Sequence, residues 1–376
     1  MPLANPSQNI RRLMKLKELS IPKLARKSGV GTATISNILN GKASPSSTTL
    51  IKISKALEVP FPKLLEEPPS LKNLRFRTNS KLTAREIAER DQLAIDSAVW
   101  LENYASLEKM TGERTRYVLG GLSCKDPLKA PGEIRKKCRL GNKEPVHDII
   151  SLVESAGIKL RLHDFGFQKT FGLSVNESDG GPAIIVNDNR NISVERKIFT
   201  VAHELGHIIL HRTSFDGKIT EENKDEEREA DTFAAEFLMP EEAFLAQWEA
   251  HRGIPWVDAV LQIKQYFGVS YKTILYFLSS RMKERFPEGK IYREFATRYR
   301  SRYGHDLKDN YEPNSVQGPV PAKDEPEELP VFCFTEERFE RLVRKAYEQE
   351  KISVSRAAEM LELPLAGMRE RIAEWL

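Results

Sequence analysis

The stretch FTVAHELGHIILH, residues 199–211, carries Glu204 and three histidines at four-residue spacing, His203, His207 and His211. At 100° per residue, these side chains and Thr200 fall on one face of a helix. The opposite face is apolar and contains Ile198, Val201, Ala202, Leu205, Ile208 and Ile209. Exposure to solvent does not by itself select such a polar stripe. The segment therefore predicts a helix, over about 193–211, with one chemically specialised face.

The spacing of the histidines suits a metal ion. Two histidines four residues apart lie about 6 Å apart along the axis, so both imidazoles can bind one Zn²⁺ at ~2.1 Å. Glu204 is rotated aside and can deprotonate a water, as in the HExxH pattern of zinc peptidases. His211 lies roughly 12 Å from His203 along the helix, too far to share the ion. We therefore predict a catalytic zinc site on His203 and His207, with His211 in a supporting or packing role; the alternative is an ordinary helix with satisfied histidines.

A third ligand is expected in KDEEREADTFAAEFLMP, residues 224–240. Glu227 can complete a His₂Glu set, and Asp231, one turn later, can orient a ligand histidine. Helical phase leaves Glu226 and Glu229 open as the ligand, and a plain solvated acidic face is a further alternative. The second donor to a reacting oxygen is unassigned; candidates by position alone are Tyr271, Tyr276 and His251.

The first sixth of the chain is basic. Residues 1–66 contain eleven Lys and Arg against three Glu, a net charge of +8 in a chain whose net charge is +4. This imbalance favours a polyanionic partner. Residues 20–59 read as a helix, a tight turn at Gly29 and a second helix from Thr32 to Leu39, followed by a helix over 47–57. The expected core is Leu24, Ala25, Val30, Ile35, Leu39, Leu50, Ala56 and Leu57.

That core leaves one side of the second helix exposed. Thr32, Ala33, Ser36 and Asn37 occupy the positions from which a recognition helix reaches base edges in the major groove. Lys42, after Gly41, is placed to bind a phosphate. The alternative is a helical bundle that binds protein instead of DNA.

Other segments organise the rest of the chain. Residues 68–76 read as a linker, and 82–110 as a long helix. Three short β-type runs predict strands at 158–162, 171–175 and 183–187. The C-terminal stretch 351–372 has the rhythm of either a helix-turn-helix or a docking hairpin. The expected fold is mainly α with a small α+β domain, divided into an N-terminal helical domain (1–67), a helical connector (68–142), the metal domain (143–283), a basic helix and flexible linker (284–330) and a small helical domain (331–376).

Composition restricts the class of protein. An apolar fraction of 40% and a charged fraction of 30% indicate a folded globular chain. Cys124, Cys138 and Cys333 are odd in number and widely spaced, which argues against a disulfide framework and favours a reducing cytoplasm. No apolar run approaches the ~20 residues that a membrane span needs. We therefore expect a cytoplasmic protein with no membrane partner.

Linked motifs in the metal region resemble a known family. IIVN, ERKIFTVAHELGHIILH and EREADTFAAEFLMP are similar to the ImmA/IrrE zinc metallopeptidases over about residues 145–283. The resemblance implies a zincin-like domain with a short sheet beside the active-site helix. It also implies that His203, His207 and Glu227 bind Zn²⁺ and that Glu204 is the general base. Asp231, four residues after Glu227, matches the same pattern. Members of the family are regulatory proteases that cleave repressors with helix-turn-helix domains.

Residues 8–66 resemble the Cro/repressor-like (Xre) helix-turn-helix family. One departure is Gly31, where the family has Ser or Thr as helix cap, so that Thr32 is an alternative cap. Together the resemblances imply a DNA-binding regulator with zinc endopeptidase activity. Its expected partners are a double-stranded DNA operator and a protein substrate, a repressor or the chain itself, and a homodimer is left open. The alternative is a non-enzymatic or antitoxin-like regulator whose zinc domain senses or binds a partner.

Overall fold

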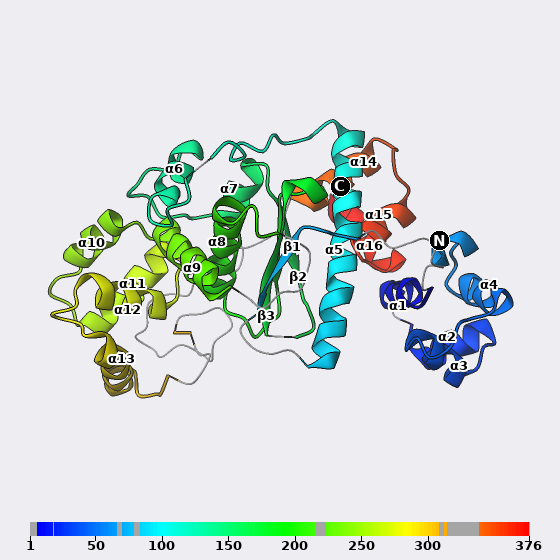
Figure 1. Ribbon diagram of the computed structural model, residues 1–376, viewed down its shortest axis with the longest axis horizontal. Coiled ribbons are helices and arrows are strands. Elements are labelled where there is room, and N and C mark those ends of the chain that lie inside the picture. Colours follow the sequence, from blue (N-terminus) through cyan, green and yellow to red (C-terminus); the bar gives the residue numbers. More distant parts are fainter. Residues whose placement is uncertain are drawn as a thin grey trace. The chain divides into compact units, whose positions relative to one another are not determined.

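The computed structural model describes residues 6–17, 19–65, 70–78, 83–122, 124–167, 169–215, 223–307, 312–313 and 338–375 (Figure 1). These residues form mostly helices and one four-stranded sheet, which confirms the mainly α fold with a small α+β part. No helix among them is long and apolar enough to cross a membrane. The chain divides into two compact units: unit 1 is Met1–Leu71, Ile87–Arg114 and Glu337–Leu376, and unit 2 is Lys72–Glu86 and Thr115–Glu336.

The N-terminal part of unit 1 is a small helical bundle. Its elements are α1 (Pro6–Leu16), α2 (Ile21–Ser28), α3 (Thr32–Leu39), α4 (Ser47–Ala56) and the short η1 (Phe61–Leu64). Ser20 and Ser46 cap α2 and α4 by accepting the backbone N–H groups of Lys23 and Thr49. Of the eight predicted core residues, six are buried, and Ala25 and Val30 pack against them. The bundle expected from the apolar spacing is therefore confirmed.

The rest of unit 1 joins a long helix to the C-terminal helices. These elements are α5 (Ala84–Thr111), α14 (Arg338–Glu348), α15 (Val354–Met360) and α16 (Leu365–Trp375). Arg338 donates to the hydroxyl of Tyr104 (2.6 Å) and to the carboxylate of Glu108 (2.8 Å). Trp100, Tyr104 and Phe339 pack as an aromatic cluster beside this pair. The C-terminal segment thus docks on α5. Within the predicted basic helix and flexible linker (284–330), residues 308–311 and 314–330 lie outside the described residues.

Unit 2 is built around the sheet, whose strand order is β1-β3-β4-β2. The strands are β1 (Leu74–Thr78), β2 (Lys159–His163), β3 (Thr170–Val175) and β4 (Ala183–Asn187). β2 and β4 are parallel, and β3 is antiparallel to both β4 and β1. Three strands match the predicted runs. The prediction of a linker over 68–76 and of only three strands is wrong, because part of that segment becomes β1 by pairing with an edge.

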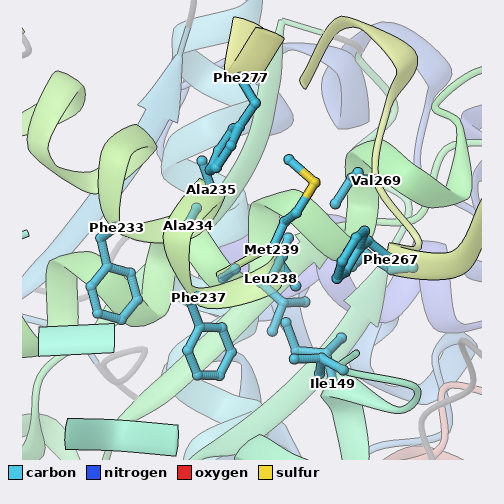
Figure 2. Packing of buried hydrophobic residues seen from close by; sticks show 14 of the residues in the cluster. Ile149, Phe233, Ala234, Ala235, Phe237, Leu238, Met239, Phe267, Val269 and Phe277 are labelled. Atoms are coloured by element: carbon cyan, nitrogen blue, oxygen red, sulfur yellow. The ribbon is translucent and has the colours of Figure 1, made fainter. Parts of the chain in front are cut away.

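The described part of unit 2 also contains helices. They are α6 (Ala130–Lys137), α7 (Ile149–Ser155), α8 (Val194–Leu210), α9 (Lys224–Leu238), α10 (Glu241–Ala250), α11 (Trp256–Phe267), α12 (Tyr271–Arg281) and α13 (Glu288–Tyr303); the short η2 (Glu177–Asp179) follows β3. α8 packs against β3 and β4 and also against α9. Phe237 on α9 and Met239 directly after it belong to one continuous core with Phe267 and Ile149 (Figure 2).

Gly206 explains why α8 and α9 lie so close together. A Cβ atom built on Gly206 would lie 2.9 Å from Cδ1 of Phe233, nearer than real Cβ contacts come. The glycine in the HELGH motif therefore lets the ring of Phe233 cover the backbone of α8. This close approach brings the first turns of α9 beside the histidines of α8.

A buried ion cluster ties α8 to α11. The ammonium group of Lys264 lies 3.0 Å from Glu195 and 3.1 Å from Glu312, and it also donates to the carbonyl of Pro313. Lys264 and Glu195 are fully buried. Burial raises the pKa of the Glu195 carboxyl, against the opposing effect of Lys264. The lysine therefore compensates two carboxylates that have little water to solvate them.

We expect Lys264→Met to destabilise the protein by about 3–5 kcal/mol, because it leaves buried carboxylates without their cation. Chemical denaturation measures this loss. Because the pKa of Glu195 is raised above its unfolded value, the deficit should be full near neutral pH and shrink as the pH falls and the carboxyl takes up a proton. Lys143→Met is the control, since Lys143 and Glu242 form an exposed pair. A similar free energy of unfolding in both variants would contradict the prediction.

Candidate metal centre and nucleic-acid interface

The polar face of α8 is buried inside unit 2. Ser193 caps the helix by accepting the N–H of Arg196, as its position at the predicted start indicated. His203, Glu204 and His207 are at most 1% exposed. Three ionisable side chains on one buried face need partners, because burial penalises charge and unpaired polar groups. The partners come from α9, from β3 and from His211 at the end of α8 itself.

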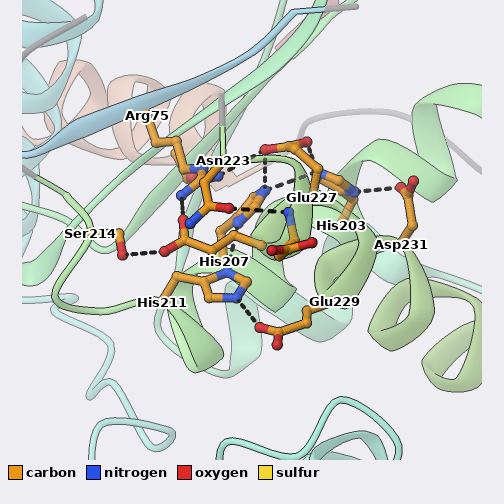
Figure 3. Close-up of polar contacts among 12 residues, drawn as sticks. Arg75, His203, His207, His211, Ser214, Asn223, Glu227, Glu229 and Asp231 are labelled. Carbon is orange, nitrogen blue, oxygen red and sulfur yellow. Dashed lines mark hydrogen bonds and ion pairs between the residues drawn. The ribbon is translucent and has the colours of Figure 1, made fainter. Parts of the chain in front are cut away.

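Glu227 on α9 lies against both histidine rings (Figure 3). The Nε2 atoms of His203 and His207 are 2.9 Å apart. One carboxylate oxygen of Glu227 is 3.2 Å from His203 Nε2 and the other is 3.3 Å from His207 Nε2. Among the described residues, these three form a group whose candidate ligand atoms all lie within 4.8 Å of one another.

The dimensions of this cluster fit a zinc ion. Ligand atoms at about 2.1 Å in tetrahedral geometry are about 3.4 Å apart. The nitrogen–nitrogen and nitrogen–oxygen separations are 2.9, 3.2 and 3.3 Å, so accommodating the ion requires shifts of only a few tenths of an ångström. Two imidazoles and one carboxylate are also the donor set of catalytic zinc sites that keep a position open for water.

The other ring nitrogens have partners that suit metal binding. Asp231 Oδ1 is 2.8 Å from His203 Nδ1, so the carboxylate can accept that proton and leave Nε2 with a lone pair toward the cluster. His207 Nδ1 is 2.9 Å from His211 Nδ1, and His211 Nε2 is 2.8 Å from Glu229. The structure thus places Asp231 and His211 on the far sides of the two rings, outside the candidate ligand group.

The protonation states also suit a cation. Burial lowers the pKa of His207 well below the usual imidazole value, so the ring is neutral near pH 7. Burial by itself favours the protonated form of Glu227, but its contacts with His203 and His207 outweigh burial and hold the pKa of Glu227 well below its usual range. A neutral imidazole and an ionised carboxylate are the forms that bind a divalent metal.

Glu204 is held from the side by strand β3. Ser174 Oγ donates to Glu204 Oε2 at 2.6 Å, and both residues are fully buried. Two residues earlier on the same strand face, a Cβ atom on Gly172 would lie 2.6 Å from a methyl of Thr200 and 3.1 Å from Glu204 Oε1. The glycine therefore leaves room for the carboxylate. Sequence reasoning missed Gly172 and Ser174, although small residues at alternate positions of FGLSV were the available signal.

Arg75 of β1 is a third residue that the sequence did not reveal. Its guanidinium lies 2.9 Å from Glu227 Oε1 and also pairs with Glu226. Burial opposes the charged guanidinium, but the hydrogen bonds to both carboxylates raise the pKa of Arg75. Ser214 donates to the other oxygen of Glu226 at 2.6 Å.

The three acidic residues that helical phase left open are therefore separated by their contacts. Glu227 lies beside both histidine rings, Glu226 faces Arg75 and Ser214, and Glu229 faces His211.

The candidates for the second oxygen donor lie on α12 and just after α10. Tyr271 stacks on Phe295, Tyr276 is half exposed, and His251 Nδ1 bonds the carbonyl of Gln247.

The predicted base-reading positions lie on the surface of α3. Thr32, Ala33 and Asn37 are exposed, and Ser36 is partly exposed. Lys42 is exposed in the loop after α3. The helix starts at Thr32 as predicted, but Gly31 is its N-cap, with no side-chain capping bond, so the alternative of a Thr32 cap is wrong. A glycine caps by leaving the first N–H groups accessible to other acceptors.

Two parts of the chain match known protein families. Residues 153–279 match the model of a peptidase family described as the IrrE N-terminal-like domain, and residues 10–64 match the helix-turn-helix model. The chain is 39% identical over 59 residues to an uncharacterized HTH-type transcriptional regulator, RghRB, of Bacillus subtilis (strain 168). That match covers 15% of this chain and 42% of the relative, so it spans about two fifths of the relative's length. The N-terminal bundle is thus similar to helix-turn-helix domains, and most of unit 2 that surrounds the candidate metal centre is similar to the IrrE N-terminal-like peptidase domain.

Proposed function

We propose that this protein is a DNA-binding transcriptional regulator with zinc-dependent endopeptidase activity, and that it cleaves a helix-turn-helix repressor or a second copy of itself. The observation that carries the proposal is the group of His203, His207 and Glu227 next to the buried carboxylate of Glu204. A structural zinc site has four protein ligands and needs no such base, whereas a hydrolytic site has three and needs one.

In this proposal, His203, His207 and Glu227 hold the zinc, and Asp231 and His211 fix the orientation of the rings. When bound, zinc supplies Lewis acidity that lowers the pKa of a water and polarises a peptide carbonyl. Glu204 accepts the proton of the attacking water and then delivers it to the departing amine. The hydrogen bond from Ser174 holds one oxygen of Glu204, so the other oxygen carries the proton. Burial excludes competing bulk water.

The two domains support each other in this function. A protease tethered to a DNA-binding domain meets proteins bound beside it at high effective concentration. A repressor on the same operator, or a neighbouring copy of this chain, is thus a natural substrate. Cleavage of such a protein converts proteolysis directly into derepression.

We also propose that the chain has five parts, with boundaries at 1–67, 68–142, 143–283, 284–330 and 331–376.

The direct test mixes the zinc-loaded protein with purified helix-turn-helix repressors, itself included, and looks for defined fragments by mass spectrometry. The matched control is Glu204→Gln. Fragments that need Glu204 and zinc are the expected result. Metal binding without turnover in any mixture, and normal induction of the regulated promoter in the Glu204→Gln strain, would instead favour a regulator whose zinc domain only senses or binds a partner.

The DNA-binding surface gives a separate prediction. Asn37→Ala should cost about 1–3 kcal/mol at one operator position and relax sequence preference there, because an amide side chain reads base edges. Lys42→Ala should weaken binding to all duplexes about equally and lower the salt slope by about one, because it loses one phosphate contact. Fluorescence anisotropy over a range of salt concentrations measures both effects, with the exposed Lys143→Ala as control. Equal effects of Asn37→Ala on operator and random duplexes would contradict the base-reading role.

A further inference from the structure

Strand β1 occupies an unusual place in unit 2. The match to the peptidase-family domain covers residues 153–279 and includes β2, β3 and β4, whereas β1 comes from residues 74–78, far upstream. Without β1, the sheet would end at β3, with a row of unpaired backbone groups. β1 pairs with this edge in antiparallel orientation. An extended peptide bound by strand addition would make the same kind of pairing.

The register places β1 beside the candidate metal centre. Arg75 is opposite Ser174, the residue that donates to Glu204. Opposed residues in an antiparallel pair point to the same face of the sheet, so Arg75 points toward the site. Its guanidinium reaches Glu227 (Figure 3) and also pairs with Glu226. A segment lying at this edge therefore passes next to both the base and the third candidate ligand.

We infer that the edge of β3 is the peptide-binding edge of the site and that β1 is its internal occupant. The competing ligand is an extended peptide segment that pairs antiparallel with β3 and carries a basic residue opposite Ser174. This inference rests on the proposed peptidase function. It adds how the substrate binds and which charge it carries, and it makes β1 a strand that controls access of the substrate to the site. β1 must leave the edge before such a peptide binds.

The charges at the edge of β3 favour a basic residue at this position of the peptide. Glu226 and Glu227 are largely buried carboxylates, with side chains 19% and 18% exposed, and Arg75 is 12% exposed between them. Removing β1 alone would leave both carboxylates without the guanidinium. A ligand that supplies a Lys or Arg at this register position replaces the lost pair, and a neutral or acidic residue does not.

Chain connectivity provides the means of release. Lys72–Glu86 is a piece of unit 2 inserted between two pieces of unit 1, Met1–Leu71 and Ile87–Arg114. Both ends of β1 therefore continue into the unit that carries the helix-turn-helix bundle. We therefore assign the release of β1 to a rearrangement within unit 1.

The first experiment locks β1 in place. Asn176 donates its backbone N–H to the carbonyl of Asn73, so the pair Phe76 and Leu173 is a non-hydrogen-bonded pair with Cα atoms about 4.5 Å apart, within the range of a disulfide. Phe76→Cys/Leu173→Cys is made in the full-length Glu204→Gln protein, which keeps a bound peptide intact. The probe is a fluorescein-labelled peptide of residues 70–80, SLKNLRFRTNS.

We expect the reduced, zinc-loaded protein to bind this peptide at least about tenfold more tightly than the oxidised form of the same protein. The apparent affinity scales with the fraction of molecules whose edge is open. If the disulfide lowers this fraction to a tenth or less of its value in the reduced form, the apparent affinity falls by about tenfold or more. A peptide with Ala in place of the arginine of position 75 should bind several-fold more weakly to the reduced form. Equal binding by the two redox forms would overturn the inference, because β1 would then be a permanent part of the sheet.

The second experiment releases β1 without touching the core. Arg75→Glu places a third carboxylate beside Glu226 and Glu227, so amide hydrogen exchange in residues 74–78 and 172–175 should rise at least about tenfold, and the labelled peptide should bind more tightly than to the unchanged protein. Arg75→Lys keeps the charge and should behave nearly as the unchanged protein. Arg190→Glu, at an exposed position, is the charge-matched control.

Unchanged exchange and peptide binding in Arg75→Glu would overturn the inference. Neither readout needs turnover, so the two proposals fail separately. Exclusion of the peptide by β1 in a protein that never cleaves a repressor would contradict the proposed peptidase function alone. Cleavage of a repressor at the same rate by the oxidised and reduced forms of Phe76→Cys/Leu173→Cys, made with Glu204 intact, would contradict only the role of β1.

Discussion

Glu204→Gln is expected to lower the rate of peptide cleavage by about 10²–10⁴-fold while zinc content, fold and operator binding stay as they are. A general base contributes about this factor, and the amide of glutamine cannot take up the proton of the attacking water. The substitution keeps the size of the side chain and an oxygen that can accept the hydrogen bond from Ser174, so the buried packing is retained. Single-turnover cleavage of a repressor, followed by electrophoresis and mass spectrometry, measures the rate.

Glu229→Gln is the matched control for this experiment. Glu229 is also an acidic residue near the histidines, but its hydrogen bond is to the outer nitrogen of His211, and a glutamine can still accept that bond. Its cleavage rate should remain within a few-fold of the unchanged protein. A comparable loss of activity in both variants would show that general negative charge near the site, and not a positioned base, supports the reaction.

His207→Ala and Glu227→Ala are expected to abolish stable zinc binding, whereas the unchanged protein should carry about one zinc per chain. Removing a direct ligand should lower the affinity by far more than the about 10–100-fold that loss of an outer hydrogen-bond partner costs. His211→Ala belongs to the second class, because the His211 ring meets Nδ1 of His207 and not Nε2, the candidate ligand atom. It should therefore still fill with zinc at saturating concentration.

Metal analysis after dialysis and competition with a chelator measure these affinities. Burial lowers the pKa of His207, so its ring should stay neutral, and zinc should stay bound, at pH values below the usual imidazole pKa; zinc should be released only as the pH falls further and the ring takes up a proton. Equal zinc loss in His207→Ala and His211→Ala would contradict the arrangement in which one histidine binds the metal and the other supports it.

The helix-borne part of the candidate site could be predicted because a helix has a fixed geometry. Once residues 193–211 are assigned to a helix, the four-residue spacing places His203 and His207 on one face, and the apolar residues define the opposite face. The same argument located Asp231 one turn after Glu227. The N-terminal core was predictable for the same reason: Leu24, Ile35 and Leu50 belong to apolar stripes at helical spacing in three short helices.

The residues that the sequence missed lie on strands that depend on distant partners. β1 is five residues long, and such a strand is not stable unless an existing edge supplies its hydrogen bonds. Its alternating pattern, LRFRT, is therefore no signal by itself. Arg75 acquires its contact with Glu227 only because β1 pairs in the register that sets it opposite Ser174. The choice of Glu227 over Glu226 and Glu229 likewise needed the crossing of α8 and α9.

By itself, the sequence determined which residues of this protein share a helix face: the histidines and base on α8, the acidic turn of α9 and the exposed side of α3. These relations depend on local periodicity, which a few consecutive residues define. The tertiary structure decided which faces meet. The close approach at Gly206 brings Glu227 to the histidines. Ser174 reaches Glu204 because β3 packs on α8. Arg75 reaches Glu227 from a strand about 150 residues upstream. Contacts of this kind depend on how whole elements pack, and no local pattern in the chain encodes them.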